Sequence, residues 1–455
     1  MSTKILVPSG VLGLGFDLEA LSLGLKRKPD IICIDGGSTD SGPFYLGTGT
    51  TKYSFDSCKL EWTHLMQARE QLGVPLVIGS CGTCGTNNMV DWMYSMTTSI
   101  AKKLKQNLTI ARVYCERSAD DLKEALKLNK ILPLDPAPVF NQKDIDSFSH
   151  IVGLAGAEPF QTALDKGADI VLVGRATDTA IISALPLMKG ENPGACWHGA
   201  KIAECGAFCS SNPSSGVILL EIDKEGFTVE AMAKNAFCTP HSVSAHMLYE
   251  NIDPFLLYEP GGSLNVKDAI YSSIDENKVR VTGSVWQPSS SYSIKLEGTK
   301  KAGYQTTMLA IIRENRYVTK AQQWAKKLHK LSVEKIVSIM KVSPEKFTID
   351  VRLIGYDATL GKMEKPVNKK PLEVGVLVII TASSQEIATE MSRLLNPYLL
   401  HLPLTDKEDL PTFAFPYSPA HTERGAVFEF SLNHIQLLDN PMNGFSLKID
   451  EVNFD

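Results

Sequence analysis

The residues best suited to chemistry follow an apolar run near the middle of the chain. The first half of the stretch Ala168–Thr179 is rich in branched side chains, which is typical of a strand buried on both faces, and the run stops at Gly174. Arg175, Thr177 and Asp178 come next, directly before a helical pattern that Thr177 or Asp178 can cap. This order predicts a site for an anion at a helix start. The alternative is that Arg175 and Asp178 only pair with each other and cap the junction.

Other strand ends in the chain carry polar residues of the same kind. Acids, bases and anion-binding groups gathered at one sheet edge are what proton removal next to a carbonyl requires. We therefore expect proton transfer by Asp35, Asp40, Glu116 and His198. We expect substrate binding by Ser38, Ser80, Gly82, Thr83, Glu158, Arg175, Thr177 and Asp178.

The loop that begins at Asp35 has two interpretations. Asp35, Ser38 and Asp40 can bind a divalent cation loosely through carboxylates and hydroxyls, or can hold an acid and base pair. Alternatively, the aspartates and serine bond their own backbone in a turn, with glycine supplying positive φ. The position of this loop at a strand end slightly favours a role in cation binding or proton transfer over a simple turn.

The glycine-rich loop 79–85 can cradle a phosphate or carboxylate with its amides. It matches neither the Walker lysine motif nor the dinucleotide-binding fingerprint. Cys81 and Cys84 have the spacing of a metal or redox pair, but no second pair with ligand spacing accompanies them. We therefore assign no metal ligand and expect no stoichiometric zinc.

The histidines give a weaker signal. His198, Lys201 and Glu204 share one helical face, which can supply a general acid or base or can be a solvated ion-pair stripe. His241 and His246 are five residues apart and do not face the same way, which argues against a two-histidine metal site. The segments 259–262 and 295–298 place charged residues beside glycines and are more typical of turns, with Glu259 kept as a weak candidate near the site.

The elements that position these residues are predicted from periodicity. Six strand-then-helix units in the first part of the chain predict an α/β fold with a doubly wound, mostly parallel sheet. Ligands in such sheets bind beyond the carboxyl ends of the strands. A polar linker at 210–216 marks a boundary, after which the pattern is mixed. We expect three consecutive domains, namely a parallel α/β domain at 1–212, a mixed α+β domain at 213–345 and a small α+β domain at 346–455.

Composition excludes several classes of protein. The 455 residues carry a net charge of -5 and no basic block, which argues against nucleic-acid binding. There is no run of eighteen apolar residues, so we expect no membrane span. Nine scattered cysteines fit reduced thiols in a cytoplasmic protein better than a disulfide framework.

Several stretches of the chain together resemble the acyclic terpene utilisation (AtuA-like) family: Val7–Phe16, Ile34–Gly47, Gly174–Thr179, Trp197–Gly206, Glu259–Gly262 and Phe413–Pro419. The resemblance runs over nearly the whole chain. It implies a cytoplasmic protein of bacterial catabolism of branched acyl or carboxylic substrates, in some members beside a CoA-ester pathway for citronellol-type terpenes. It brings no settled reaction and no assigned catalytic residues. Relatives tend to have small residues such as alanine in place of Cys81 and Cys84, which weakens the metal interpretation of that pair.

The sequence thus predicts a lyase or hydratase acting on a small carboxylate or acyl-CoA, with CoA entering as part of the substrate. One alternative is a non-catalytic partner subunit that binds an acyl ligand. A metal-dependent hydrolase is the second alternative, and it requires three convergent ligands that spacing does not identify. We expect a homo-oligomer in the cytoplasm, with no nucleic-acid or membrane partner.

Overall fold

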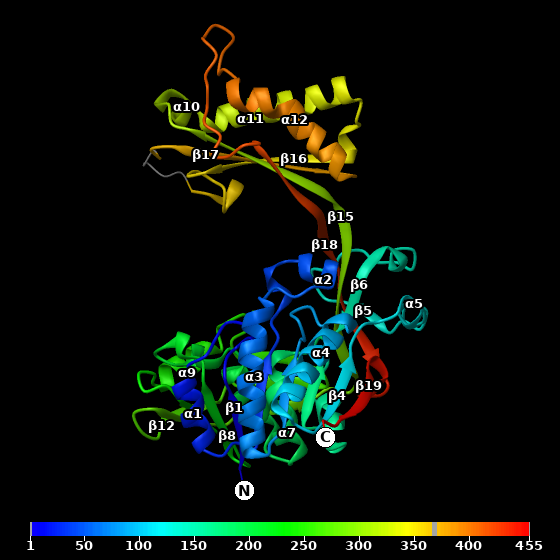
Figure 1. Ribbon diagram of the computed structural model, residues 1–455, viewed down its shortest axis with the longest axis vertical. Helices are drawn as coiled ribbons and strands as arrows, with labels where there is room; N and C mark the ends of the chain where they lie inside the picture. The colour runs from blue at the N-terminus through cyan, green and yellow to red at the C-terminus, as the bar shows by residue number, and fades with distance from the viewer. Residues whose placement is uncertain (1, 366–370, 455) are drawn as a thin grey trace. The chain divides into compact units, whose positions relative to one another are not determined.

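A computed structural model describes residues 2–365 and 371–454 (Figure 1). The chain forms two compact units, one made of residues 1–300 with 429–455 and the other of residues 301–428. This division differs from the three consecutive segments that we expected, because strands from the middle and the end of the chain join the first sheet. Within the described ranges, no helix is both long and apolar enough to cross a membrane.

The first unit is organised around a ten-stranded mixed sheet. Its strands are β1 (Thr3–Val7), β2 (Ile31–Asp35), β3 (Leu76–Gly79), β4 (Leu108–Tyr114), β7 (Ile170–Val173), β8 (Ile218–Ile222), β9 (Gly226–Ala231), β12 (Ile270–Ser273), β13 (Lys278–Thr282) and β19 (Ser446–Val452). Their order is β12-β13-β9-β8-β1-β2-β3-β7-β4-β19. The strands β1, β2, β3, β7 and β4 are parallel, and antiparallel strands extend both sides. The predicted α/β class is confirmed.

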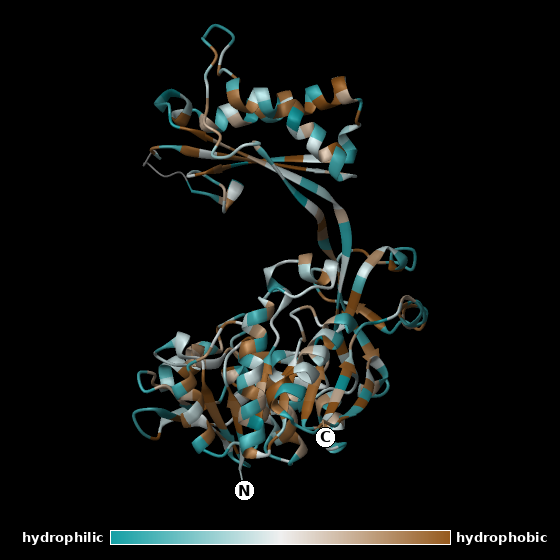
Figure 2. Cartoon of the chain, viewed as in Figure 1, coloured by the Kyte–Doolittle hydropathy of each residue, from teal (hydrophilic) through white to brown (hydrophobic). Residues whose placement is uncertain are grey.

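The parallel core is apolar throughout. Every residue of β2, β3 and β7 is buried, as the continuous branched runs predicted. Figure 2 shows these central strands in the colour of hydrophobic residues, whereas the helices carry both polar and apolar positions. The strand predicted at 150–154 does not join the parallel sheet. It corresponds to β6 (Phe148–Gly153), which pairs antiparallel with β15 (Tyr292–Ile312) in another sheet.

Helices of the first unit follow most of its parallel strands. They are α1 (Leu18–Lys26), α2 (Phe44–Thr48), α3 (Phe55–Leu72), α4 (Asn87–Leu104), α5 (Ala119–Lys127), α6 (Ala157–Asp165), α7 (Asp178–Met188), α8 (Pro193–Ala203) and α9 (Pro240–His246). The side chain of Asp17 caps α1 and that of Ser118 caps α5, by accepting hydrogen bonds from the first-turn amides. A three-stranded sheet of β10 (Leu256–Glu259), β11 (Gly262–Asn265) and β14 (Val285–Pro288) completes the unit, together with β5 (Ile131–Pro133).

The second unit is a small α+β structure. Its sheet includes parts of β15 and β18 (His421–Leu438) with β16 (Phe347–Ile354) and β17 (Val374–Ala382), and its helices are α10 (Asn315–Thr319), α11 (Ala321–Lys335) and α12 (Gln385–His401). Buried positions alternate along β17, as in a sheet with one covered face. Figure 1 shows α11 and α12 lying over one face of this sheet. The covered face buries Trp324, Met308 and Leu395.

Candidate functional site

Polar residues gather at the carboxyl edge of the parallel strands. Asp35 is the last residue of β2, Ser80 follows β3, Glu116 follows β4, and Arg175 lies two residues beyond β7. These strands are parallel neighbours in the order β2-β3-β7-β4, so their carboxyl ends share one edge. Two clusters with different charge balance lie there, both within the first unit.

The first, which we call the Arg175 cluster, consists of Arg175, Glu297, Ser80, Thr39 and Lys295. Arg175 is only 5% exposed, and its Nε donates to Glu297 Oε2 at 3.1 Å while its Nη1 donates to Ser80 Oγ at 2.9 Å. Thr39 Oγ1 also donates to Glu297, at 3.1 Å, and Lys295 Nζ lies 3.3 Å from Glu297 Oε1. Burial alone would raise the pKa of Glu297, but the charges of Arg175 and Lys295 lower this pKa to about 2. The buried charges of this cluster are therefore paired.

The second, which we call the carboxylate cluster, consists of Asp35, Asp178, Glu204, Glu259 and Lys201. A narrow internal space, too small for a water molecule, lies beside its first three members and is lined by Val7, Cys33, Ile34, Asp35, Asp178, Ile181, Ile182 and Glu204. Asp35 is buried, and its Oδ2 accepts a hydrogen bond from the Gly37 amide at 2.9 Å. Asp35 Oδ1 is also buried and has no hydrogen-bond partner among the described residues.

The pKa values of both aspartates in this cluster are raised. Burial and the charge of Asp178 raise the pKa of Asp35, against the opposing charge of Arg175. Burial likewise raises the pKa of Asp178, although Arg175 and Lys201 lower it. Two carboxyl groups in this arrangement resist ionising together, so one can carry a proton while the other accepts one.

Helix α8 supplies the cation of the carboxylate cluster. Lys201 Nζ lies 2.5 Å from Glu204 Oε1, and both side chains are about 95% buried. Burial still raises the pKa of Glu204 to about 8, against the charge of Lys201. Glu259 follows the same rule, with burial raising its pKa to about 7 although the Thr179 hydroxyl donates to it. The carboxylates of this cluster therefore outnumber its lysine. Asp178 and Glu259 are half-buried, which places them on the side nearest solvent.

Several predicted site residues have other partners. Glu116 Oε1 lies 2.6 Å from His150 Nδ1, and Glu116 Oε2 accepts from the Asn87 amide at the start of α4, so this carboxylate caps a helix. Glu158 accepts a hydrogen bond from the Tyr292 hydroxyl at 2.6 Å.

Asp40 is exposed and accepts a hydrogen bond from Ser38 Oγ at 2.7 Å. Ser38 in turn caps the short 3₁₀ turn η1 (Thr39–Ser41). The local-turn interpretation therefore describes Ser38 and Asp40, whereas Asp35 belongs to the carboxylate cluster. Thr177 is half-buried, and its hydroxyl lies 3.3 Å from that of Thr179.

His198 does not join either cluster. Its Nδ1 lies 2.7 Å from Ser284 Oγ and its Nε2 lies 3.1 Å from the Tyr271 hydroxyl. Burial lowers the pKa of His198 to about 3, and its ring packs edge-on against Phe227 and Tyr271. The structure thus places His198 in a packed contact between α8 and the strands β9 and β12, while Lys201 and Glu204 of the same helical segment reach the strand ends.

The glycine-rich loop uses its amides internally. The amides of Cys81, Thr83 and Gly85 donate to the carbonyls of Val173, Ser80 and Cys81. Thr83 Oγ1 accepts from the Lys52 amide at 3.3 Å, and Gly82 has positive φ, as have Ser80 and Thr83. A Cβ at Gly85 would lie 2.2 Å from the backbone nitrogen of Arg175, so only glycine fits where this loop meets the Arg175 backbone. The loop therefore contacts the Arg175 backbone, and the amides of Cys81, Thr83 and Gly85 are used in hydrogen bonds within the protein.

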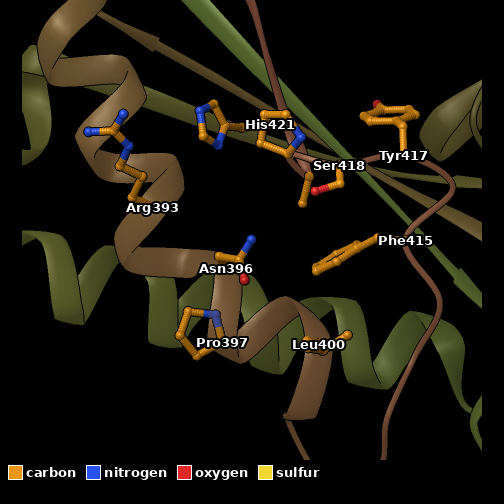
Figure 3. Close-up of a pocket in the computed structure, with 10 residues that line it drawn as sticks. Arg393, Asn396, Pro397, Leu400, Phe415, Tyr417, Ser418 and His421 are labelled. Carbon is orange, nitrogen blue, oxygen red and sulfur yellow. The ribbon is translucent and has the colours of Figure 1, made fainter.

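An open groove of about 690 Å³ lies in the second unit. It is lined by Arg393, Asn396, Pro397, Leu400, Phe415, Tyr417, Ser418, Pro419, Ala420 and His421. Figure 3 shows the ring of Phe415 pointing toward Asn396 on α12. Arg393 is exposed and pairs with Glu390, so this groove lacks the buried, unbalanced charge of the strand-end cluster.

Comparison with known proteins gives one match. The family model described as "Acyclic terpene utilisation family protein AtuA" matches residues 64–412, more than half of the chain. The chain belongs to the AtuA family. The matched AtuA region contains every member of the carboxylate cluster except Asp35. Searches of curated proteins and of solved structures return no match. AtuA membership associates the chain with acyclic terpene utilisation and leaves its reaction open.

Proposed function

We propose that this AtuA protein is a catabolic enzyme that acts on a small carboxylate or a branched acyl-CoA by lyase or hydratase chemistry. The carboxylate cluster is its active site, and Asp35 and Asp178 exchange the proton. The observation that carries this proposal is Asp35 Oδ1, a buried acceptor without a partner in the described chain. It belongs to a carboxyl group whose pKa is raised by burial and by the charge of Asp178. Buried polar atoms are normally hydrogen-bonded, and exceptions call for a functional account.

Addition or elimination of water next to an acyl group requires both a base and an acid. The base removes a proton from the carbon beside the carbonyl, and the acid protonates the leaving hydroxyl. Asp35 and Asp178 line one narrow space, and burial raises the pKa of each. A pair of this kind can hold the proton on one member and accept it on the other at neutral pH. Lys201 supplies a positive charge toward which the acyl or carboxylate oxygen can point.

The substrate would approach from the half-buried side of Asp178, Thr177 and Glu259. The space between Asp35, Asp178 and Glu204 is too narrow for water, so binding requires side chains of the cluster to separate. CoA enters only as part of the substrate. The enzyme works as a cytoplasmic homo-oligomer on small molecules, without a nucleic-acid or membrane partner.

A specific contrast distinguishes this proposal from a non-catalytic acyl-binding subunit. In such a subunit, the strand-end carboxylates are expected to lie too far apart to contact one ligand. Here Asp35, Asp178 and Glu204 line the same space, which supports catalysis.

Exchange of substrate protons with deuterated solvent tests the proposal. Purified protein is incubated with branched unsaturated acyl-CoAs, their 3-hydroxy forms and the free acids, and products are followed by mass spectrometry. We expect gain or loss of water, or deuterium incorporation next to the carbonyl, for at least one member of the panel. Asp56→Asn, a change at an exposed position of α3, serves as a control that retains this activity. A ligand that raises the melting temperature but never exchanges a proton would favour the non-catalytic alternative.

A further inference from the structure

Three potential metal ligands converge beside the carboxylate cluster. Glu204 and Cys205 directly follow α8, and His246 is the last residue of α9. One carboxylate oxygen, the thiol sulfur and one ring nitrogen of these residues all lie within 4.8 Å of one another. This set contains neither the Cys81 and Cys84 pair nor the combination of His241 with His246, which are the pairs that sequence spacing brings to notice.

His246 provides an independent sign that a ligand belongs here. The residue is 5% exposed, and its Nε2 is buried without a hydrogen bond to any described residue. Its ring stacks on Tyr249, with centroids 5.6 Å apart, which fixes the plane of the imidazole. Burial of an imidazole nitrogen without a partner is unfavourable unless a ligand occupies it.

The surroundings favour a cation. One of the three donors is the carboxylate of Glu204, which brings a negative charge to the site. Lys201 is the nearby positive charge, and it pairs with Glu204 Oε1. Cys205 is half-buried, so an ion can reach the site from solvent.

We propose that Glu204, Cys205 and His246 bind one divalent ion of the zinc type. This proposal replaces the expectation of no stoichiometric zinc, which rested on the spacing of the cysteines alone. A thiolate, an imidazole and a carboxylate together suit this borderline-soft ion. Ligands around one zinc ion lie about 2.0–2.3 Å from the metal, so the three donor atoms have to approach one another by roughly 1 Å, which side-chain rotation can supply. Three protein ligands leave the fourth position open for water or substrate, as in catalytic rather than structural zinc sites.

The test uses the full-length protein, stripped with a chelator and then titrated with Zn²⁺ and with Co²⁺ in the absence of any acyl substrate. We expect one equivalent of either ion per chain and, with Co²⁺, the near-ultraviolet absorption of a sulfur-to-cobalt charge transfer. Cys205→Ala should abolish that absorption, and His246→Gln should weaken binding more than about 100-fold, beyond the usual effect of losing an outer-shell partner. Matched controls are Cys196→Ala, on the same α8, and His241→Gln, an exposed position on the same α9; both should bind as the wild type does.

Absence of stoichiometric binding, or a charge-transfer band that survives in Cys205→Ala, would overturn the proposal. Melting curves of the metal-free variants show whether each one folds. If Cys205→Ala does not fold, X-ray absorption of the wild-type zinc complex decides the question, because the proposal requires one sulfur ligand and a different number contradicts it. The metal site shares Glu204 with the carboxylate cluster, but the two tests fail separately, since metal binding is measured without substrate and proton exchange is measured with it.

Discussion

The Arg175 cluster and the carboxylate cluster lie at the same edge of one sheet, yet they differ in charge balance. Arg175 and Glu297 form a buried pair, and Lys295, Thr39 and Ser80 complete their contacts. Beside them lie the four carboxyl groups of the carboxylate cluster. Lys201 pairs with Glu204, the charge of Arg175 acts on Asp35 and Asp178, and Asp35 Oδ1 has no partner within the part of the chain that is described. Paired buried charges indicate a structural role, whereas unpaired ones indicate a site that holds protons or a ligand.

This contrast changes the expected role of Arg175. The sequence suggested an anion-binding arginine, or else a partner for Asp178. The guanidinium instead donates to Glu297, to Ser80 and to the Gly37 carbonyl. We therefore infer that Arg175 organises the strand ends and that its charge also acts on Asp35 and Asp178, while Lys201 is the cation paired with Glu204.

The largest effect is expected from Asp35→Asn, which removes the unpaired carboxylate and keeps its shape. Loss of a general acid or base lowers the rate by about 10²–10⁴-fold, so turnover or solvent proton exchange should fall by that factor. The melting temperature should change little, because asparagine has the shape of the protonated carboxyl group and can still accept the hydrogen bond from the Gly37 amide. Asp56→Asn should retain full activity. If Asp35→Asn kept full activity, the carboxylate cluster would not be the active site.

Arg175→Gln should have the next largest effect, on stability. Glu297 would keep a buried charge with only the partly exposed Lys295 near it, and breaking a buried pair in this way costs about 3–5 kcal/mol of the free energy of unfolding. Chemical denaturation of the substrate-free protein measures this loss. Lys234→Gln, which removes an exposed ion pair with Glu19, should leave the transition unchanged. The structural role of Arg175 would be contradicted if Arg175→Gln kept its stability but lost the ligand-induced shift in melting temperature. That result would mean that Arg175 binds substrate.

A smaller effect should appear in the pH dependence of stability, through Glu259. Burial raises its pKa from 4.5 to about 7, so the folded state binds this proton more tightly than the unfolded state does. This contribution is present in full below pH 4.5 and is lost as the pH rises through about 7. It corresponds to roughly 3 kcal/mol, at about 1.4 kcal/mol per pKa unit.

Denaturation of wild type and Glu259→Gln across this pH range isolates the contribution. The variant should show a flatter decline in stability than the wild type. Glu225→Gln, at an exposed turn, is the control and should follow the wild type. Identical pH profiles for wild type and Glu259→Gln would show that Glu259 titrates as it does in the unfolded chain.

Sequence periodicity predicted the parallel core well, because buried strands such as β2 and β7 are uninterrupted apolar runs that end in Asp35 or Gly174. Periodicity also placed the strand beginning at His150 in the parallel sheet. That strand, β6, instead pairs with β15, which lies more than a hundred residues further along the chain. The three predicted domains failed to anticipate β19, which returns from the C-terminus to pair with β4. Long-range pairing of this kind leaves no local signal in one sequence.

The site was predicted only in part, because some of its residues are brought together by long-range packing. Asp35 and Asp178 stand at strand ends and are recognisable there, whereas Glu297 reads as a turn residue beside Gly298. Lys201 and Glu204 were recognised as an ion pair, but only the fold shows that this pair is buried. His246 lies about forty residues from Cys205 in the sequence, and only the packing of α9 beside the end of α8 brings the two together.

The most direct test of the central claim is infrared difference spectroscopy of the metal-free protein near neutral pH. A carboxyl group that keeps its proton absorbs as a carboxylic acid, separately from ionised carboxylates. We predict a carboxylic acid band at pH 7 that Asp35→Asn diminishes and that the control Asp56→Asn leaves intact. If the wild type shows no carboxylic acid band at pH 7, or if Asp35→Asn does not change it, then Asp35 and Asp178 do not share a proton and the carboxylate cluster is not the acid and base site.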